Sequence, residues 1–457
     1  MYNKTMQDLD LTKIKNVHFI GIGGIGISAV ARMMLHEGKT VTGQDMQGGE
    51  IVDGLKKLGI DIKIGQSYEN IPADADLIVY TIAIDTYDPE LAKKIKNQDT
   101  VPVRSYPQML DTISKDKYTI AISGTHGKTT TTAMIAQILN ESGKSPTVIV
   151  GSLIKSKDGS RTNFIAGDPN HTDGQEKNNY FVVEACEYRR SFLNINPKVL
   201  VITNIDEDHL DYYKDIEDIK SAFHEMAMKV PEGGFVVCNP DDENVGEVVK
   251  GINAKIINWQ EFYNGELKLK VPGVHNKKDA AAAVAAGVTL GLSKEDSEKY
   301  VCNFPGTWRR FEFKGKLAGG ALVYDDYAHH PHEITATMEG FRELYSKENG
   351  WKITVVFQPH LFSRTKSLLN DFAQSFKDVD EVLILPIYYA REVDDGTISS
   401  EILSIEINKY TNNSKAFLSF EDLENYLKAK IPSMGEKDVI VTMGAGEAFK
   451  VGDFLLK

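Results

Sequence analysis

Cysteine is scarce in this sequence: the chain has three, Cys186, Cys238 and Cys302, scattered over 457 residues. That number and spacing exclude a disulfide framework and a cysteine-rich zinc cluster, and they favour a reduced, cytoplasmic setting. Long apolar runs are also missing, since the first ten residues hold no signal-peptide core and the weakly polar stretch 280–292 is too short to span a membrane. We therefore expect a cytoplasmic protein that does not cross a membrane.

The sequence has no basic surplus. Its 52 Lys and Arg residues stand against 65 Asp and Glu, a net charge of −13, and no block of like charges interrupts the even spread. A general binder of nucleic acid or of anionic membranes would be basic, so neither partner is expected. The composition is otherwise that of a soluble globular protein, and roughly 150 residues per domain predicts about three domains.

One pattern recurs three times: a short β-rich run, then a glycine cluster, then a segment of helical periodicity. It occupies residues 17–38, 118–143 and 438–457. Each occurrence indicates a nucleotide-binding-like βα unit, and together they predict an α/β fold. No repeat of 20–50 residues accompanies them, which excludes solenoids and propellers.

Domain boundaries can be placed only approximately, because no linker rich in Pro, Gly and Ser marks them. The stretch 107–117 precedes the second βα unit, and the turn-like FPGTW at 304–308 precedes the last third of the chain. The expected domains are 1–117, 118–312 and 313–457.

The strongest motif is GTHGKTT at 124–130, between a predicted strand and a predicted helix. Backbone N–H groups of such a loop face phosphates, Lys128 can reach the β and γ oxygens, and the Thr129 hydroxyl can bind Mg²⁺. The usual spacing requires Gly at position 122, where this chain has Ile122, so the loop is a shorter variant. ATP binding is favoured over a glycine turn that merely caps a helix.

A second glycine loop, GIGGIG at 21–26, is followed by Asp45 about nineteen residues later. This matches a dinucleotide fingerprint, in which the glycines allow close approach of a diphosphate and the carboxylate takes a ribose hydroxyl. The motif alone does not choose between NAD, FAD and a nucleotide sugar. Glycines that serve only to pack the helix on the strand are the alternative.

Polar residues follow the apolar strands of the middle of the chain, where an open α/β sheet binds its ligands. Glu184 follows YFVV (180–183) and is a candidate second Mg²⁺ partner beside the phosphate loop. His209 comes shortly after VLVIT (199–203). It is a metal or phosphate ligand, or else a surface or helix-capping residue.

In the last third, strands again end in His, Tyr, Asp and Arg. His329, His330 and His332 lack the H-x₃-H spacing that places two imidazoles on one helix face, so we interpret them as substrate or phosphate contacts rather than as a zinc site. Arg309 and Arg310 lie in the predicted hinge, where an arginine can stabilise a transferring phosphate. An interdomain salt bridge is the alternative for one of the two.

At this point the sequence resembles a known family, the Mur ligases of peptidoglycan synthesis, and within it the branch that adds L-alanine. The resemblance spans nearly the whole chain. It rests on HFIGIGGIG (18–26), SGTHGKTTT (123–131), VVEACE (182–187), TNIDEDHLDYY (203–213), VPGVHNKKDA (271–280), TWRRFE (307–312), DDYAHHPHEI (325–334), FQPHLFSRT (357–365) and MGAGE (443–447).

The resemblance implies a UDP-sugar-binding Rossmann-like domain, a central P-loop ATPase domain with a mostly parallel sheet, and a C-terminal Rossmann-like domain that takes the amino acid. It implies that ATP and Mg²⁺ activate the lactyl carboxylate of UDP-N-acetylmuramate as an acyl phosphate, which L-alanine attacks to form an amide. A monomer or homodimer is expected, without nucleic-acid or membrane partners.

Site residues are carried over position by position. The UDP-sugar contacts would be Gly21, Gly23, Gly24, Gly26, Asp45, Thr81, Ala83 and Ile84. ATP would be held by Gly124, Thr125, His126, Gly127, Lys128, Thr129 and Thr130, with His275 and Asn276 near the adenine. Metal ligands would be Thr129, Glu184 and His209; amino-acid and phosphate contacts would be Tyr327, His329, His330 and Arg364. The catalytic set would be Lys128, Glu184, His209, Arg310 and His329.

Several positions depart from the family pattern. Cys186 replaces an acid in E-A-C-E, and a thiol is a poor Mg²⁺ ligand. Arg189 and Arg190 follow where acidic or small residues are common, and we expect both to be solvated strand-end residues, with contact to a substrate carboxylate as the alternative. Other departures are Asp279 for Asn, Glu447 for Asp, and His224 where other Mur ligases carry a carbamylated lysine, a lysine that the alanine-adding branch commonly lacks too.

Three other functions remain open at this point. The first is the recycling ligase that joins UDP-N-acetylmuramate to a tripeptide, although its first glycine loop usually departs from GIGGIGIS (21–28). An NAD-dependent oxidoreductase would leave GTHGKTT unexplained. A non-catalytic UDP-sugar sensor would predict the loss of Lys128, Thr129 or Glu184, and all three are present.

Overall fold

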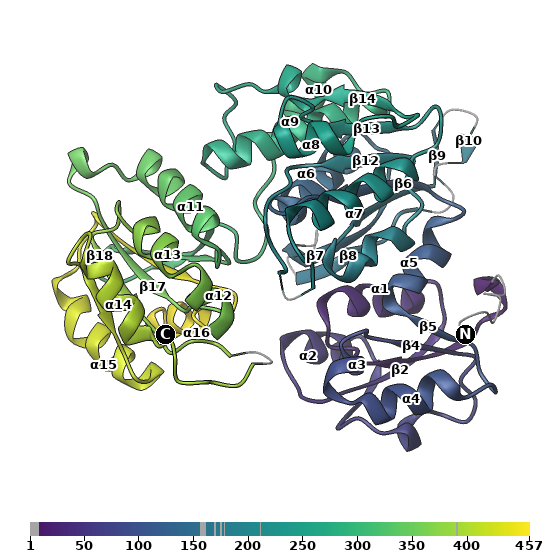
Figure 1. Cartoon of the computed structure of the whole chain (residues 1–457), viewed down its shortest axis with the longest axis horizontal. Helices are drawn as coiled ribbons and strands as arrows, with labels where there is room; N and C mark the ends of the chain where they lie inside the picture. Colours follow the sequence, from purple (N-terminus) through teal and green to yellow (C-terminus); the bar gives the residue numbers. More distant parts are fainter. Residues whose placement is uncertain are drawn as a thin grey trace. The chain divides into compact units, whose positions relative to one another are not determined.

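A computed structural model describes residues 9–155, 161–168, 171–173, 176–177, 179–210, 212–389 and 392–457 (Figure 1). The chain forms two units. The first comprises Met1–Asn264 and Asp279–Asn303, and the second comprises Gly265–Lys278 and Phe304–Lys457. The segment 265–278 therefore belongs with the C-terminal part of the chain.

The first unit begins with a parallel sheet in the order β3-β2-β1-β4-β5. Its strands are β1 (Asn16–Ile20), β2 (Thr40–Asp45), β3 (Asp61–Ile64), β4 (Leu77–Tyr80) and β5 (Val103–Ser105). Its helices are α1 (Ile25–His36), α2 (Glu50–Lys57), α3 (Ile84–Tyr87), α4 (Pro89–Asn97) and α5 (Tyr106–Ser114). This strand order is that of a Rossmann-type sheet, whose ligand crevice lies where the order reverses, between β1 and β4. The Rossmann-like prediction is confirmed.

The same unit contains a seven-stranded sheet in the order β14-β13-β12-β6-β11-β7-β8, parallel except for β8. Its strands are β6 (Tyr118–Ser123), β7 (Thr147–Lys155), β8 (Arg161–Ile165), β11 (Tyr180–Glu184), β12 (Val199–Ile202), β13 (Phe235–Cys238) and β14 (Lys255–Asn258). Its helices are α6 (Lys128–Glu141), α7 (Ile216–Met228), α8 (Glu243–Val248) and α10 (Lys294–Val301). A two-stranded ribbon pairs β9 (Thr172–Asp173) with β10 (Glu176–Lys177), and α9 (Val274–Thr289) begins in the second unit and ends in the first.

The second unit holds a six-stranded sheet in the order β15-β16-β20-β17-β18-β19, in which β15 is antiparallel. Its strands are β15 (Glu312–Lys316), β16 (Leu322–Asp326), β17 (Lys352–Phe357), β18 (Glu381–Ile384), β19 (Ser414–Ala416) and β20 (Asp438–Met443). Its helices are α11 (Pro331–Leu344), α12 (Phe362–Ser367), α13 (Leu369–Ser375), α14 (Ser400–Asn408), α15 (Phe420–Lys430) and α16 (Phe449–Leu455). Short 3₁₀ turns in the chain occupy Leu11–Lys13, Tyr68–Asn70, Tyr188–Asn194, Trp259–Phe262, Lys347–Asn349 and Ile431–Ser433. The three-sheet α/β architecture agrees with the expected fold, while boundaries at 117 and 312 stay predictions.

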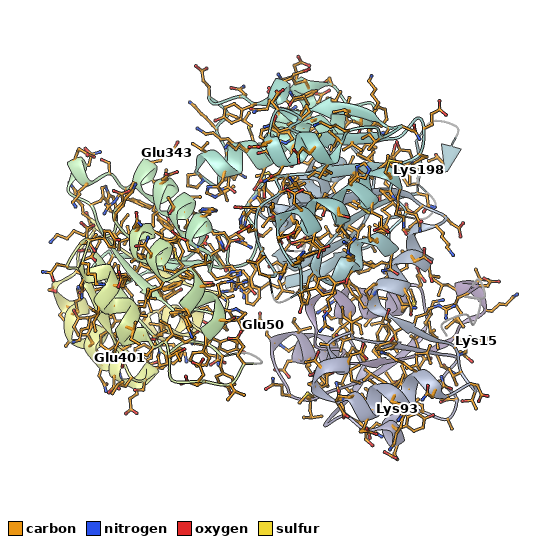
Figure 2. The ribbon with its side chains drawn as sticks, viewed as in Figure 1. Lys15, Glu50, Lys93, Lys198, Glu343 and Glu401 are labelled. Atoms are coloured by element: carbon orange, nitrogen blue, oxygen red, sulfur yellow. The ribbon has the colours of Figure 1, made fainter. Side chains whose placement is uncertain are left out.

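The central strands are apolar along their whole length because helices cover both faces of a parallel sheet. In β6, β11 and β12, for example, every interior residue is buried. Charged side chains lie outside, as Lys93 and Glu401 illustrate in Figure 2. One hydrophobic cluster runs through both sheets of the first unit, where α1 packs on β7 and β8. Asn163 Nδ2 donates to Ser28 Oγ at 2.8 Å and helps to join the two sheets.

Within the described residues, no helix combines the length and the apolar character needed to cross a membrane.

Candidate active site

The GTHGKTT segment forms a tight loop from the end of β6 to the start of α6. Gly124 and Gly127 have φ angles of 136° and 81°, which disfavour any residue with a Cβ. A Cβ would also lie 2.0 Å from Thr203 Oγ1 at Gly124, and 2.3 Å from Asp279 Oδ1 at Gly127. The glycines are therefore required by the backbone and by its neighbours.

The residues after β12 hold this loop in shape. His126 N–H donates to Asn204 Oδ1 at 2.9 Å, Thr125 N–H donates to the Asn204 carbonyl at 3.1 Å, and Thr203 Oγ1 donates to the His126 carbonyl at 2.6 Å. With the loop fixed from outside, the first N–H groups of α6 are left to face an anion. The predicted strand–loop–helix context of a phosphate loop is confirmed, in the shorter form with Ile122.

Lys128 opens α6 and folds back over the loop. Its Nζ donates to the Thr125 carbonyl at 3.0 Å and to Glu187 Oε1 at 3.1 Å, and it also donates to the Gly124 carbonyl. Burial lowers the pKa of Lys128, but the charge of Glu187 outweighs it and holds that pKa above its ordinary value. The lysine therefore carries a fixed positive charge at the loop.

Glu184 ends β11 beside the loop. Its Oε1 accepts a hydrogen bond from Thr129 Oγ1 at 3.1 Å, and its Oε2 accepts one from the Gly151 N–H at 2.8 Å. A Cβ at Gly151 would lie 2.4 Å from Glu184 Oε1, so glycine is what lets the carboxylate sit there. A hydroxyl and a carboxylate in contact are oxygen donors of the kind that Mg²⁺ prefers, and these two residues fit the ion.

Glu187 is the residue that the sequence analysis missed. Its side chain is 3% exposed, and its carboxylate contacts Lys128 on one side and His209 Nε2, at 3.7 Å, on the other. His209 has φ +55° and packs against Tyr188 in a tilted arrangement, with ring centroids 4.7 Å apart. The helix that follows it, α7, is capped by Asp215, so the alternative of His209 as a capping residue is wrong. The signal was present in VVEACE, whose second acid is also at the strand end.

The first glycine loop lies between β1 and α1, facing the residues that follow β4. Gly21 has φ +75°, and a Cβ there would lie 2.3 Å from Thr81 Cγ2. Asp45 Oδ2 accepts a hydrogen bond from the Gly23 N–H at 2.8 Å, so this carboxylate orders the loop itself. Ile84 is fully buried, and its predicted contact with the UDP-sugar stays a prediction. The loop and Thr81 meet at the predicted crevice.

His275 and Asn276 lie in the part of α9 that belongs to the second unit, and their relation to the phosphate loop stays a prediction. Asn276 Nδ2 donates to the Pro272 carbonyl at 2.5 Å. Burial, with a smaller contribution from Arg310, lowers the pKa of His275 to about 4.

The two hinge arginines have different environments. Arg309 is buried, and its Nε donates to Asp325 Oδ2 at 2.6 Å while its Nη1 donates to the Gly446 carbonyl at 3.0 Å. Arg310 is partly exposed, 3.8 Å from Glu333 and with its guanidinium 5.2 Å from the Tyr327 ring centroid. The salt-bridge alternative therefore applies to Arg309, within the second unit rather than between domains, and Arg310 is the accessible one.

Imidazole and phenol rings gather at the carboxyl ends of β16 and β17. His329 Nδ1 lies 2.9 Å from the Tyr327 carbonyl and 3.4 Å from Glu333, and burial lowers the pKa of His329. Its ring is 5.8 Å from that of His360, whose Nδ1 lies 3.3 Å from an Arg364 nitrogen. Sequence reasoning quoted His360 within FQPHLFSRT but did not select it.

His330 behaves differently from its neighbour. It is the N-cap of α11, where its ring Nδ1 accepts a hydrogen bond from the His332 N–H at 3.4 Å. Its predicted substrate contact stays a prediction.

Among the departures, Cys186 is exposed between Glu184 and Glu187, and Asp279 packs under Gly127. Glu447 pairs with Lys450, and the His224 ring nitrogen bonds the Val248 carbonyl at 2.7 Å.

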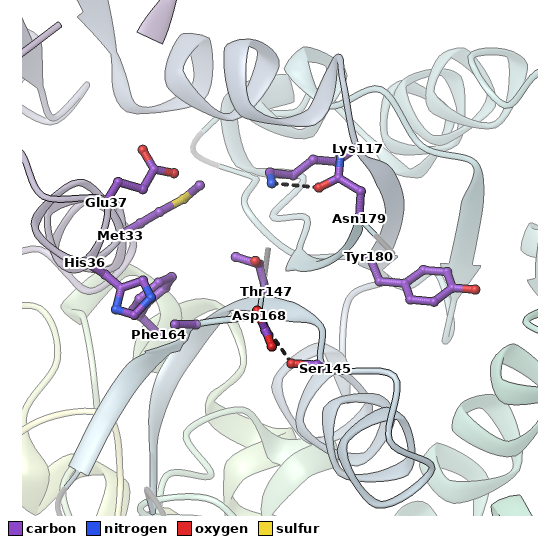
Figure 3. Close-up of a pocket in the computed structure, with 12 residues that line it drawn as sticks. Met33, His36, Glu37, Lys117, Ser145, Thr147, Phe164, Asp168, Asn179 and Tyr180 are labelled. Atoms are coloured by element: carbon purple, nitrogen blue, oxygen red, sulfur yellow. Dashed lines mark hydrogen bonds between the residues drawn. The ribbon is translucent and has the colours of Figure 1, made fainter. Parts of the chain in front are cut away.

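A separate cavity of about 180 Å³ lies in the first unit at the amino ends of β6, β7 and β11 (Figure 3). Phe164 and His36 border it on one side, and Lys117, hydrogen-bonded to Asn179 at 3.0 Å, on the other. Because the phosphate loop follows the carboxyl end of β6, this cavity belongs to the opposite edge of the sheet and is not part of the candidate site.

Three family models match successive parts of the chain. Residues 16–118 match the model of the Mur ligase family, catalytic domain; residues 122–264 match the Mur ligase middle domain; residues 309–446 match the Mur ligase, glutamate ligase domain. The UDP-N-acetylmuramate–L-alanine ligase of Acetivibrio thermocellus is 42% identical over 98% of this chain and 97% of its own. That of Clostridium acetobutylicum is 41% identical over 97% of each chain.

Solved structures give the same result. The crystal structure of UDP-N-acetylmuramate-alanine ligase from Thermotoga maritima covers 97% of this chain and 98% of its own, with a TM-score of 0.76 and 29% identity. A murein peptide ligase from Psychrobacter arcticus shares the fold, with a TM-score of 0.66 and 24% identity over 97% of this chain and 98% of its own. Three consecutive family matches and relatives at about 40% identity over nearly the full length lead to one conclusion. The chain belongs to the Mur ligase family.

Proposed function

We propose that this protein is an ATP-dependent ligase that joins L-alanine to the lactyl carboxylate of UDP-N-acetylmuramate, in peptidoglycan precursor synthesis. The observation that carries the proposal is the identity of 41–42%, over at least 97% of the chain, with two relatives that bear this activity in their names. The cluster of Lys128, Glu184, Glu187 and His209 at one edge of the central sheet supports it.

In this proposal the loop 124–130 binds the phosphates of ATP, with His275 and Asn276 near the adenine. Thr129, Glu184 and His209 would hold Mg²⁺, which supplies positive charge against the phosphates when it is bound. The oxygen donors Thr129 and Glu184 are already in contact, which supports this assignment. Cys186 contributes little, because a thiol is a poor ligand for a hard cation.

The reaction brings two anions together, a carboxylate and the γ-phosphate. Lys128 places a permanent positive charge at the phosphates, and Glu187 and the loop carbonyls orient it. Attack of the carboxylate oxygen on the γ-phosphorus forms an acyl phosphate and releases ADP. Arg310, the accessible hinge arginine, would then face the transferred phosphate.

The second half of the reaction needs a neutral amine. The Tyr327 carbonyl can only accept a hydrogen bond, so Nδ1 of His329 carries the proton and Nε2 is left as an acceptor. A pKa lowered by burial keeps this ring neutral near pH 7. Nε2 of His329 can therefore accept a hydrogen bond from the amine as it attacks, while Arg364 and Tyr327 contact the amino acid or the phosphate.

The test is phosphate release from ATP in the presence of Mg²⁺ and UDP-N-acetylmuramate, with L-alanine, the tripeptide L-Ala-γ-D-Glu-meso-diaminopimelate, or no acceptor. Release that requires L-alanine, and that Lys128→Ala abolishes, is the expected result. Release only with the tripeptide would assign the chain to the recycling activity. Silence with every acceptor would favour a non-catalytic UDP-sugar sensor. A cytoplasmic location and a monomeric or homodimeric state remain predictions from the sequence.

A further inference from the structure

The 3₁₀ turn that follows the metal-binding strand end contains an unusual backbone. Arg189 and Arg190 are consecutive residues in the left-handed region, at φ +54°, ψ +30° and φ +54°, ψ +25°. Neither is a glycine or an asparagine, the residues that occupy this region readily. Holding two arginines in this conformation costs backbone energy. Strained backbone of this kind clusters at functional sites.

One of the two arginines is fully accounted for by the fold. Arg190 Nη2 lies 2.8 Å from Asp218 Oδ1 and its Nη1 lies 3.2 Å from Glu225 Oε2. Burial lowers the pKa of Arg190, but the hydrogen bond and the charge of Asp218 together outweigh it and hold that pKa above its ordinary value. The positive charge of this side chain is therefore balanced by two carboxylates of α7.

The other arginine faces the UDP-sugar domain. Arg189 Nη2 donates to Thr86 Oγ1 at 3.3 Å, and its guanidinium lies 5.6 Å from the centroid of the Tyr188 ring. In the part of the chain that the structure describes, no carboxylate forms an ion pair with Arg189. A guanidinium has five donors, so most of its hydrogen-bonding capacity is left for another partner.

The surroundings of Arg189 define where such a partner would lie. Thr86 precedes Tyr87, whose hydroxyl is 3.5 Å from the position of a Cβ on Gly21, the first glycine of the diphosphate-type loop. On the other side, the Tyr188 ring packs against the ring of His209. Arg189 therefore lies between the glycine loop and the cluster around Lys128, on the way from one to the other.

We propose that Arg189 binds the diphosphate of the UDP-sugar substrate from the central domain. This rests on the proposed function, because a substrate that reaches from the glycine loop to the ATP phosphates must pass this guanidinium. A diphosphate at the loop accepts hydrogen bonds from the N-terminal N–H groups of α1 on one side. The planar guanidinium supplies bidentate, charge-assisted bonds on the other side. This proposal differs from both sequence-based expectations for Arg189, a solvated residue or a contact to the substrate carboxylate.

The experiment is calorimetric titration of wild-type protein, Arg189→Ala and Arg189→Lys with UDP-N-acetylmuramate, UDP and uridine. The alanine variant should weaken binding of UDP-N-acetylmuramate and UDP about tenfold to a hundredfold, as expected for lost charge-assisted hydrogen bonds, and leave uridine unchanged. The lysine variant should recover part of the loss. Lys93→Ala removes the same charge from an exposed site on α4 and should bind all three ligands as the wild type does.

Two outcomes would overturn the inference. Equal affinity of wild type and Arg189→Ala for UDP and UDP-N-acetylmuramate would show that the side chain does not contact the ligand. A loss confined to UDP-N-acetylmuramate would assign the contact to the lactyl carboxylate instead. A wild-type protein that binds no uridine nucleotide would overturn the proposed function as well, so the two failures are distinguishable. Thermal unfolding of each variant separates loss of binding from loss of folding.

Discussion

The phosphate loop of the first unit and the ring cluster of the second are built in different ways. Around the loop, the backbone N–H groups are the functional groups, and neighbouring Thr203 and Asp279 leave no room for a Cβ at Gly124 or Gly127. In the second unit, side chains from separate strand ends meet, and His360 contacts both His329 and Arg364. A backbone site is encoded in contiguous sequence, whereas a side-chain site exists only once the strands are paired.

Removing the charge of the phosphate loop should have the largest effect. We expect Lys128→Ala to lower kcat by about 10²–10³-fold or more, because the fixed charge opposite the transferring phosphate is lost. Steady-state phosphate release with L-alanine measures it. Thermal unfolding should show that the variant is folded, and activity within a few-fold of the wild type would contradict the assignment.

Substitution of Arg309 and of Arg310 tests whether the first stabilises the fold and the second acts in catalysis. Arg309→Ala leaves Asp325 as a buried carboxylate without its cation, which should cost about 3–5 kcal/mol of unfolding free energy. Arg310→Ala should change stability by no more than about 0.5 kcal/mol and act instead on kcat. Denaturant unfolding followed by activity assays distinguishes them. Equal destabilisation by both variants would contradict the division.

Glu187 connects the lysine of the loop to His209, and it was not predicted. Glu187→Gln keeps the shape but removes the charge, so kcat should fall about tenfold to a hundredfold, as for residues that orient a ligand. Glu225→Gln offers a matched control, since this acid is 60% exposed and contacts Arg190 away from the loop. Unchanged kcat in Glu187→Gln would remove Glu187 from the site.

These residues show which parts of the fold and of the candidate site can be predicted from the sequence. The strand–glycine–helix units and the three-sheet α/β class follow from local patterns, and β6, β11 and β20 begin and end within a residue or so of the predicted runs. The residue pattern alone did not choose between Arg309 and Arg310, although the family resemblance selected Arg310, because the choice depends on which guanidinium reaches Asp325. Glu187 and His360 were likewise inside quoted motifs, but only the fold shows which neighbours they contact.

The smallest expected effect is on the pKa of His275. Measuring this pKa separates the contribution of burial from that of the Arg310 charge. The pKa of His275 is lowered to about 4, first by burial and then by the charge of Arg310. Since the unfolded chain binds the proton near pH 6.5 and the folded chain does not, this histidine stabilises the fold above pH 6.5, and that contribution is lost as the pH falls toward 4. Arg310→Ala should raise the pKa of His275 only modestly, because burial remains. NMR titration of the imidazole protons measures both values. A midpoint near 6.5 in the wild type would contradict burial as the main cause, while a full return to 6.5 in Arg310→Ala would assign the shift to the arginine.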